Sequence, residues 1–208
     1  MTKRIVIIVE GSTEKAFKPA LLDYLSRKLA SRMPKLKFIS EDGRIPTKDR
    51  LKRDVKRLLE QHQAVIALTD IYTGPRPFDF LDAADAKNKM RQWVGHEPRF
   101  YPHAAQYEVE AWLLPFWSRI QQISGSNQTA PSSSPETVNH DKPPARHLEE
   151  VFRTGRNKRA YSKTRDGADI LRDQDLEVSA ARCPELRAFL DTILALSTPE
   201  SSDTETDP

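Results

Sequence analysis

Two acidic residues stand where the sequence predicts the ends of buried strands. Glu10 follows the apolar run 5–9, and Asp70 follows a second apolar run, 64–69. A carboxylate at the carboxyl end of a central strand faces the crevice in which open α/β sheets bind ligands, and burial there is unfavourable unless a cation or hydrogen-bond donors compensate. Two such acids indicate a divalent-metal site, although each could instead cap the turn or helix that follows it.

Glu108 and Glu110 complete the candidate ligand set, because they come just after a further predicted strand. Magnesium prefers hard oxygen ligands in octahedral geometry and commonly takes only one or two carboxylates, with water or phosphate oxygens in the other positions. Mn²⁺ is the alternative ion. Two acids that are two residues apart share a face only in an extended chain, and in a helix they diverge by about 200°. The sequence leaves open which of the two reaches the metal, and whether either only favours a helix start.

Two basic stretches could meet phosphate. Residues 44–57 hold seven Lys and Arg residues against two Asp residues, and residues 153–165 hold basic residues with no acid. Such clusters are typical of nucleic-acid contacts, although a solvated surface is the plain alternative for each. The candidate nucleic-acid-binding residues of the second stretch are Arg159, Tyr161, Lys163 and Arg165. The aromatic ring in this group would stack on a base, and the charges would neutralise the phosphate backbone.

Alternating strands and helices must position these residues. The chain has 208 residues, of which 38% are hydrophobic, enough for one domain with a real core. Apolar periodicity and turn residues predict strands and helices in alternation. The predicted strands cover residues 5–9, 36–39, 64–69 and 99–103, and the helices begin near residues 13, 47 and 80. This order predicts an α/β fold with a mostly parallel sheet and helices on both faces.

Composition divides the chain into four parts. Residues 1–123 form the α/β core, and residues 124–145, rich in Ser, Pro, Thr and Asn, read as a flexible linker or insertion. Residues 146–196 have apolar helical faces but too few residues for a core of their own, so we expect a small C-terminal helical extension packed on the sheet. Residues 197–208 form an acidic tail that we expect to be disordered.

Several function classes are disfavoured. No apolar run reaches the roughly 20 residues of a membrane helix, and no signal peptide precedes the first strand, so a cytoplasmic location is expected. Cys183 is the only cysteine, which excludes an internal disulfide and a thiolate zinc cluster and favours an inert buried thiol. Residues 11–13 carry neither a dinucleotide-binding fingerprint nor a Walker lysine. His103, near a strand end, is either a proton-transfer group or a structural histidine.

Four short motifs together resemble a known pattern. The segments are VEGSTE at 9–14, DIYTG at 70–74, EVEAWL at 108–113 and YSKT at 161–164. They resemble the Toprim fold, the metal-binding domain of topoisomerases, primases, recombination proteins and overcoming-lysogenization-defect nucleases. They are more similar still to a family of small bacterial Toprim-like proteins of uncharacterised function. The resemblance spans roughly residues 5–194.

This resemblance implies a metal-dependent nuclease that cleaves the phosphodiester bonds of DNA or RNA. Glu10, Asp70 and Lys163 would be its catalytic residues, with Glu10 as general base or as the group that orients the attacking water. Relatives of this type are often encoded beside an ABC-type ATPase and act against phage, which implies an effector with an ATPase partner. The general pattern has a second aspartate where this chain has Tyr72. The alternative is therefore a non-catalytic nucleic-acid-binding or regulatory subunit of an ATPase complex.

Overall fold

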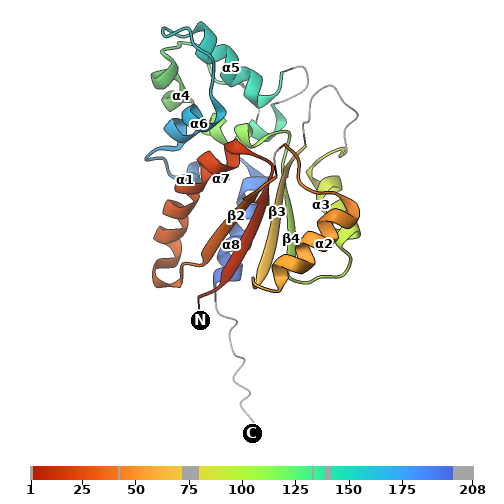
Figure 1. The fold of residues 1–208 in the computed structure, drawn as a ribbon. Coiled ribbons are helices and arrows are strands. Elements are labelled where there is room, and N and C mark those ends of the chain that lie inside the picture. The colour runs from red at the N-terminus through yellow and green to blue at the C-terminus, as the bar shows by residue number, and fades with distance from the viewer. Residues whose placement is uncertain (1, 42, 72–79, 133, 139–141, 199–208) are drawn as a thin grey trace.

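The strands form one parallel sheet in the order β2-β1-β3-β4 (Figure 1). The computed structural model describes residues 2–41, 43–71, 80–132, 134–138 and 142–198. Within them the strands are β1 (Arg4–Val9), β2 (Lys35–Ser40), β3 (Ala64–Asp70) and β4 (Phe100–Ala105). β1 and β3 are the central strands, which explains why both are nearly continuous apolar runs: each must bury both of its faces.

Helices cover both faces of this sheet. The α-helices are α1 (Ser12–Leu29), α2 (Lys48–Leu59), α3 (Ala83–Val94), α4 (Trp117–Ser124), α5 (Pro144–Thr154), α6 (Lys163–Leu171), α7 (Leu176–Ala180) and α8 (Pro184–Ser197). Three 3₁₀ segments are η1 (Ala30–Arg32), η2 (Val109–Phe116) and η3 (Pro135–Thr137). None of the helices in the described part of the chain is long and apolar enough to cross a membrane.

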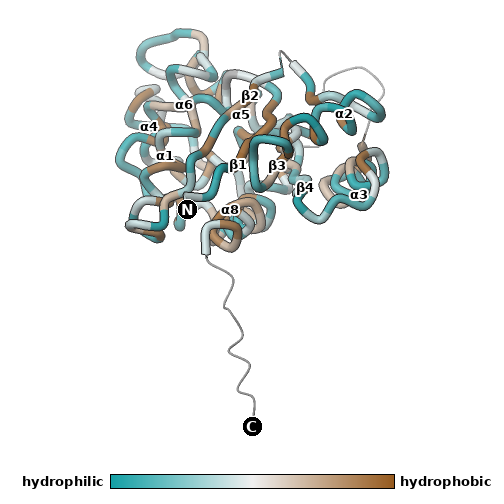
Figure 2. Tube along the Cα trace, turned by 60° about the horizontal axis from the view of Figure 1, so that its bottom comes forward, coloured by the Kyte–Doolittle hydropathy of each residue, from teal (hydrophilic) through white to brown (hydrophobic). Residues whose placement is uncertain are grey.

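Alternation along the strands separates two apolar clusters. Val6 and Ile8 of β1 point toward α2 and α3, whereas Ile5 and Ile7 point toward α1 and α8. Apolar residues accordingly gather along the sheet and on the helix faces turned toward it (Figure 2). The prediction of a mostly parallel α/β sheet with helices on both faces and a helical C-terminal part is confirmed.

The helices that follow η2 form a cap over one end of the sheet. α4, α5 and α6 lie above the carboxyl ends of the strands, and α8 then returns alongside β4 (Figure 1). The cap therefore stands over the edge where the sequence places its acidic residues.

Residues 124–138 make buried contacts that their polar composition does not predict. Glu136 is buried, and its carboxylate accepts hydrogen bonds from Trp112 Nε1 at 3.0 Å and from the Glu185 and Leu186 amides at 3.1 and 3.4 Å. The two amides belong to the first turn of α8, so this carboxylate caps that helix. Val138 joins the apolar cluster nearby. Polar side chains thus attach a segment that was expected to be a flexible insertion.

Replacing Glu136 tests this attachment. Glu136→Ala leaves the Trp112 indole N–H and two helix N–H groups without their acceptor, so we expect a loss of about 1–3 kcal/mol in the free energy of unfolding. Denaturant unfolding measures this loss. Glu149→Ala, at a side chain that is 47% exposed, is the matched control and should change stability little. Equal stability of both variants and the wild type would show that residues 124–138 are only loosely held.

Candidate metal and phosphate site

Pairing of β1 with β3 brings Glu10 and Asp70 together. The strands run parallel, with Val9 opposite Leu68, so both acids emerge at the same edge. Glu10 Oε1 accepts hydrogen bonds from the Asp70 amide, at 3.2 Å, and from the hydroxyl of buried Thr69. The Glu10 side chain is therefore held over the end of β3 by the strand that carries the second acid.

η2 adds two further carboxylates to this edge. Asp70 Oδ1 accepts a hydrogen bond of 3.0 Å from Val109 N, the first amide of η2. Glu108 has extended backbone angles (φ −149°, ψ 152°) and Glu110 lies in the first turn. This change of conformation between the two residues allows both side chains to be buried beside the strand ends. The structure thus brings together the four acids that the sequence identified as candidate ligands.

Glu108 and Glu110 have different partners. Glu108 Oε2 accepts a hydrogen bond of 2.9 Å from Ala145 N in the first turn of α5, so this carboxylate also caps a helix. Glu110 Oε1 accepts from Thr13 Oγ1 at 3.2 Å and lies 2.9 Å from Lys163 Nζ. Glu110 is 0% exposed, and its Oε2 atom has no hydrogen-bond partner among the described residues. Among the oxygens of these acids, Glu110 Oε2 is therefore the clearest candidate to bind a cation.

Glu14, which is buried, is a fifth carboxylate at this edge, and sequence reasoning did not include it in the site. Its Oε2 accepts a hydrogen bond of 3.1 Å from Gly11 N, the N-cap amide, so this carboxylate caps the start of α1. An acid in the first turn of a helix is favoured there without any ligand site, so the position of Glu14 carries no local signal of one. Only the fold shows that the capping carboxylate also faces Glu10 and Glu110.

Crowding of these acids changes how they ionise. Burial, with added repulsion from Glu14, raises the pKa of Glu10 to about 7. Burial, with repulsion from Glu110, likewise raises the pKa of Glu108 to about 7. Burial and then the neighbouring carboxylates raise the pKa of Asp70 well above its usual value. Carboxyl groups with raised pKa values keep part of their protons near neutral pH, and a cation that balances the negative charge favours their ionised form.

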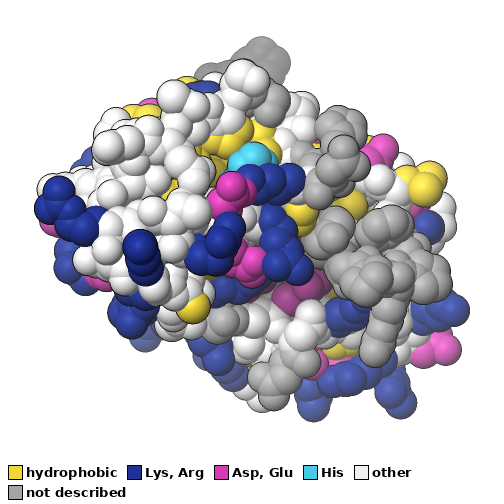
Figure 3. Space-filling view, turned by 90° about the horizontal axis from the view of Figure 1, so that it is seen from above, with side chains coloured by type: hydrophobic (Ala, Val, Ile, Leu, Met, Phe, Trp, Pro, Cys, Tyr) yellow, Lys and Arg dark blue, Asp and Glu magenta, His cyan; other side chains and the backbone are white. Residues whose placement is uncertain are grey.

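Lys163 supplies a positive charge directly at the cluster. It is the first residue of α6, and its side chain is 44% exposed although its ammonium contacts a fully buried carboxylate. Burial lowers the pKa of Lys163, but Glu110 outweighs that effect and the pKa lies above its usual value. Arg44 adds a weaker attraction for Glu10. From above, acidic side chains lie in a hollow with Lys and Arg side chains around it (Figure 3).

Asp166 pairs with Arg159 and Arg165, the two arginines among the candidate nucleic-acid-binding residues. This residue is 0% exposed, and its carboxylate accepts from Arg159 Nη1 at 2.6 Å, Arg165 Nε at 3.0 Å and Ser162 N at 2.7 Å. The two guanidinium groups therefore hold the turn before α6 in place. Arg165 remains 60% exposed and keeps further donors for a phosphate, whereas Arg159 is 29% exposed.

Tyr161 lies differently from the stacking surface that the sequence suggested. Its ring packs against Phe152, with centroids 5.4 Å apart, and its hydroxyl is buried with no hydrogen-bond partner in the described part of the protein. Burial, followed by the charge of Glu110, raises the pKa of this phenol. The ring is part of the packing between α5 and α6, and the apolar residues of both helices explain its inward position.

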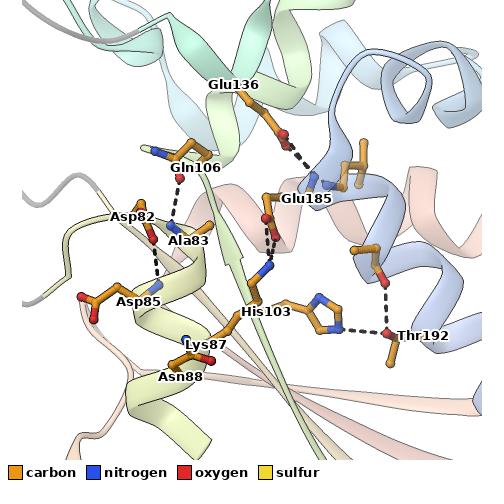
Figure 4. A network of polar contacts seen from close by, with 12 residues as sticks. Asp82, Ala83, Asp85, Lys87, Asn88, His103, Gln106, Glu136, Glu185 and Thr192 are labelled. Carbon is orange, nitrogen blue, oxygen red and sulfur yellow. Dashed lines mark hydrogen bonds and ion pairs between the residues drawn. The ribbon is translucent and has the colours of Figure 1, made fainter.

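His103 and Cys183 lie outside the acidic cluster. His103 is buried on β4, with Nε2 3.0 Å from Thr192 Oγ1 and its ring against Phe189, and burial lowers its pKa to about 4 (Figure 4). It lines a cavity of about 750 Å³ between α3, β4 and α8 that includes none of the five carboxylates. Burial raises the pKa of the Cys183 thiol to about 12, in keeping with an inert thiol. His103 is thus better explained as a structural histidine than as a proton-transfer group.

The carboxylate cluster has the right ligand atoms and charge for a hard divalent cation, but its side chains are not arranged around a common point. It offers only oxygen ligands, shares a surplus of negative charge and includes the unpartnered Glu110 Oε2. Among the described residues, however, no group of three acids, histidines or cysteines converges tightly enough to hold an ion as it stands. Tyr72, at the position of the second aspartate of the general pattern, lies outside the described residues. Coordination of an ion would require the carboxylate side chains to move closer together.

The Asp166 contacts predict a pH-dependent contribution to stability. Burial raises the pKa of Asp166, but the bonds from Arg159, Arg165 and the Ser162 amide outweigh it, so the pKa lies below its usual 3.8. The stabilisation is therefore fully present above pH 3.8 and is lost as pH falls through the lower pKa of the folded state. Asp166→Asn should be less stable than the wild type at neutral pH, by urea unfolding, and this difference should shrink in acid. A pH-independent difference would contradict this assignment.

Comparisons with known proteins agree with this fold. The chain is similar to the C-terminal region of the Burkholderia pseudomallei OLD protein, at 14% identity and a TM-score of 0.54, over 95% of this chain and 100% of that one. The C-terminal region of the Xanthomonas campestris pv. campestris OLD protein matches at 16% identity and a TM-score of 0.46, over 93% of this chain and 97% of that one. No curated protein matches the sequence.

The first of these structures supports the Toprim-like fold that the motifs suggested. At the level of sequence, one family model covers most of the chain, residues 9–194, and so includes all five carboxylates and Lys163. The chain therefore belongs to the family described as a domain of unknown function, DUF4276.

Proposed function

We propose that this protein is a divalent-metal-dependent nuclease that hydrolyses phosphodiester bonds of DNA or RNA. The observation that carries the proposal is the cluster of Glu10, Asp70, Glu108 and Glu110 at the carboxyl ends of β1 and β3, with Lys163 at its rim. Buried acids at this edge destabilise the fold unless a cation or hydrogen-bond donors compensate their negative charge, and such clusters are common at functional sites. Holding a cation against a polyanionic substrate is the role that suits them best.

The residues divide the chemistry among them. Glu10, Asp70 and Glu110, with Glu108 or Glu14, would hold Mg²⁺ or Mn²⁺, which would polarise the phosphodiester and stabilise the leaving oxygen. Glu10 would orient the attacking water and accept its proton as the new phosphorus–oxygen bond forms and the old one breaks. The Thr69 hydroxyl keeps Glu10 in position. Lys163 and Arg165 would neutralise the phosphate of the substrate.

The wider role rests on the resemblance of the motifs to small Toprim-like proteins. On that basis we propose a cytoplasmic effector that works with an ABC-type ATPase partner against phage. Lys and Arg side chains around the acidic hollow support the nucleic-acid part of this proposal (Figure 3). They do not distinguish DNA from RNA, because both have the same phosphate groups and differ at the 2′-hydroxyl of the sugar.

A second candidate function is a non-catalytic nucleic-acid-binding or regulatory subunit of an ATPase complex. Two observations favour it: Tyr72 replaces a carboxylate of the general pattern, and no described group of three ligands is already assembled. A tyrosine does not act as a carboxylate ligand at neutral pH, since its phenol titrates near 10. In this alternative the basic surface binds nucleic acid and the acids have no reaction to perform.

Glu10→Gln tests the proposal. The variant keeps an oxygen that can accept from Thr69, so we expect it to fold and to melt no lower than the wild type in chelator. Mn²⁺ should raise the melting temperature of the wild type and have a much smaller effect on the variant. Cleavage of labelled single-stranded and double-stranded DNA and RNA should fall by about 10² or more in the variant.

Three outcomes separate the candidates. A metal-dependent melting shift and cleavage that are both lost in Glu10→Gln support the nuclease. Metal binding without cleavage of any tested nucleic acid supports the regulatory subunit. An equal melting shift in Glu10→Gln and the wild type would remove Glu10 from the metal site. Glu97→Gln, at an acid paired with Arg99 outside the cluster, is the matched control and should behave like the wild type.

A further inference from the structure

The ion pair between Lys163 and Glu110 joins a partly exposed cation to a fully buried anion. Glu110 is 0% exposed and is also held by the Thr13 hydroxyl, whereas the lysine side chain is 44% exposed. Both contacts fall on Oε1, and Oε2 remains buried with no partner among the described residues. One oxygen of this carboxylate thus carries the internal cation, and the other is open to a second one.

This arrangement suggests that Lys163 has a role in the protein before metal or substrate binds. Five buried or half-buried carboxylates share the edge of the sheet, and Lys163 makes a direct ion pair with one of them, Glu110. We propose that Lys163 is the internal counter-ion of the cluster in the metal-free protein, and that an entering divalent cation displaces its ammonium from Glu110. The inference rests on the metal site of the proposed function and adds an exchange between lysine and metal.

The backbone around Lys163 suits such an exchange. The Ser162 hydroxyl accepts a hydrogen bond from Arg165 N and caps α6, and Asp166 fixes the turn through the Ser162 amide and the Arg159 guanidinium. The Cα of the lysine is therefore anchored. Its flexible four-carbon stem can leave Glu110 by rotation of single bonds, without movement of the helix.

Electrostatics gives the direction of the exchange. A divalent cation bound through Oε2 of Glu110 would stand close to an ammonium on Oε1, and like charges at that separation repel. The displaced ammonium would move toward solvent, which the half-exposed side chain of Lys163 already reaches at the rim of the hollow (Figure 3). Lys163 would then be free to contact a substrate phosphate only after the metal has entered, so metal loading would precede substrate engagement.

Thermal melting of Lys163→Met tests the exchange. Methionine keeps the length and the apolar stem of lysine without its charge. In chelator we expect the variant to melt below the wild type, because the cluster has lost its counter-ion. In Mn²⁺ the two proteins should melt closer together, so the metal-induced shift is larger in the variant, and Mn²⁺ affinity by calorimetry should rise several-fold.

Lys87→Met is the matched control. Lys87 pairs with Glu185 at 2.6 Å between α3 and α8, outside the carboxylate cluster (Figure 4). Its loss should lower melting by the same amount in chelator and in Mn²⁺. A metal-induced shift in Lys163→Met that equals that of the wild type would overturn the exchange while the metal site of the proposed function stands. No metal-induced shift in the wild type would instead remove the metal site itself.

A measurement on the wild-type protein covers the case in which Lys163→Met does not fold. Pulse labelling with an amine-reactive reagent, read by mass spectrometry, reports how free each lysine ammonium is. Labelling of Lys163 should increase several-fold when Mn²⁺ replaces chelator, and labelling of Lys87 should stay constant. Unchanged labelling of Lys163, in a protein whose melting temperature Mn²⁺ raises, would overturn the exchange.

Discussion

The parallel pairing of β1 with β3 is the constraint on which the rest of the site depends. It sets Glu10 and Asp70 at one edge, and the hydrogen bond from the Asp70 amide to Glu10 ties their positions to the register of the sheet. A shift of one residue in that register would turn the apolar side chains of β1 from one cluster to the other. The apolar core that stabilises the fold therefore also fixes the spacing of the acids.

Polar contacts then attach the helical cap to this edge. Val109 N donates to Asp70, Ala145 N donates to Glu108, and Lys163 pairs with Glu110. In each case a carboxylate of the cluster meets the start of η2, α5 or α6. The same carboxylates that would bind metal therefore help to hold the cap in place. Metal binding would first change the hydrogen bonds and the ion pair at these helix starts.

Much of the sheet and its acids could be predicted from sequence, because buried parallel strands are apolar runs and an acid that ends such a run is conspicuous. Asp70 and Glu10 were identified in this way. Glu14 was not, since an acid in the first turn of a helix is common without any ligand site. The buried role of Glu136 depends on segments brought together from distant parts of the sequence, and no local pattern signals such contacts. Tyr161 packs on Phe152 only because the turn before α6 folds back on α5.

The central claim is that the clustered carboxylates bind one divalent ion, and the most direct measurement is anomalous diffraction from a crystal soaked in Mn²⁺. The account predicts a single strong peak at the carboxyl ends of β1 and β3, with oxygens of Asp70 and Glu110 at coordination distances of about 2.0–2.6 Å. It also predicts that the Lys163 ammonium has left Glu110. No peak at this edge, or carboxylates turned away from one another in a metal-rich crystal, would contradict it.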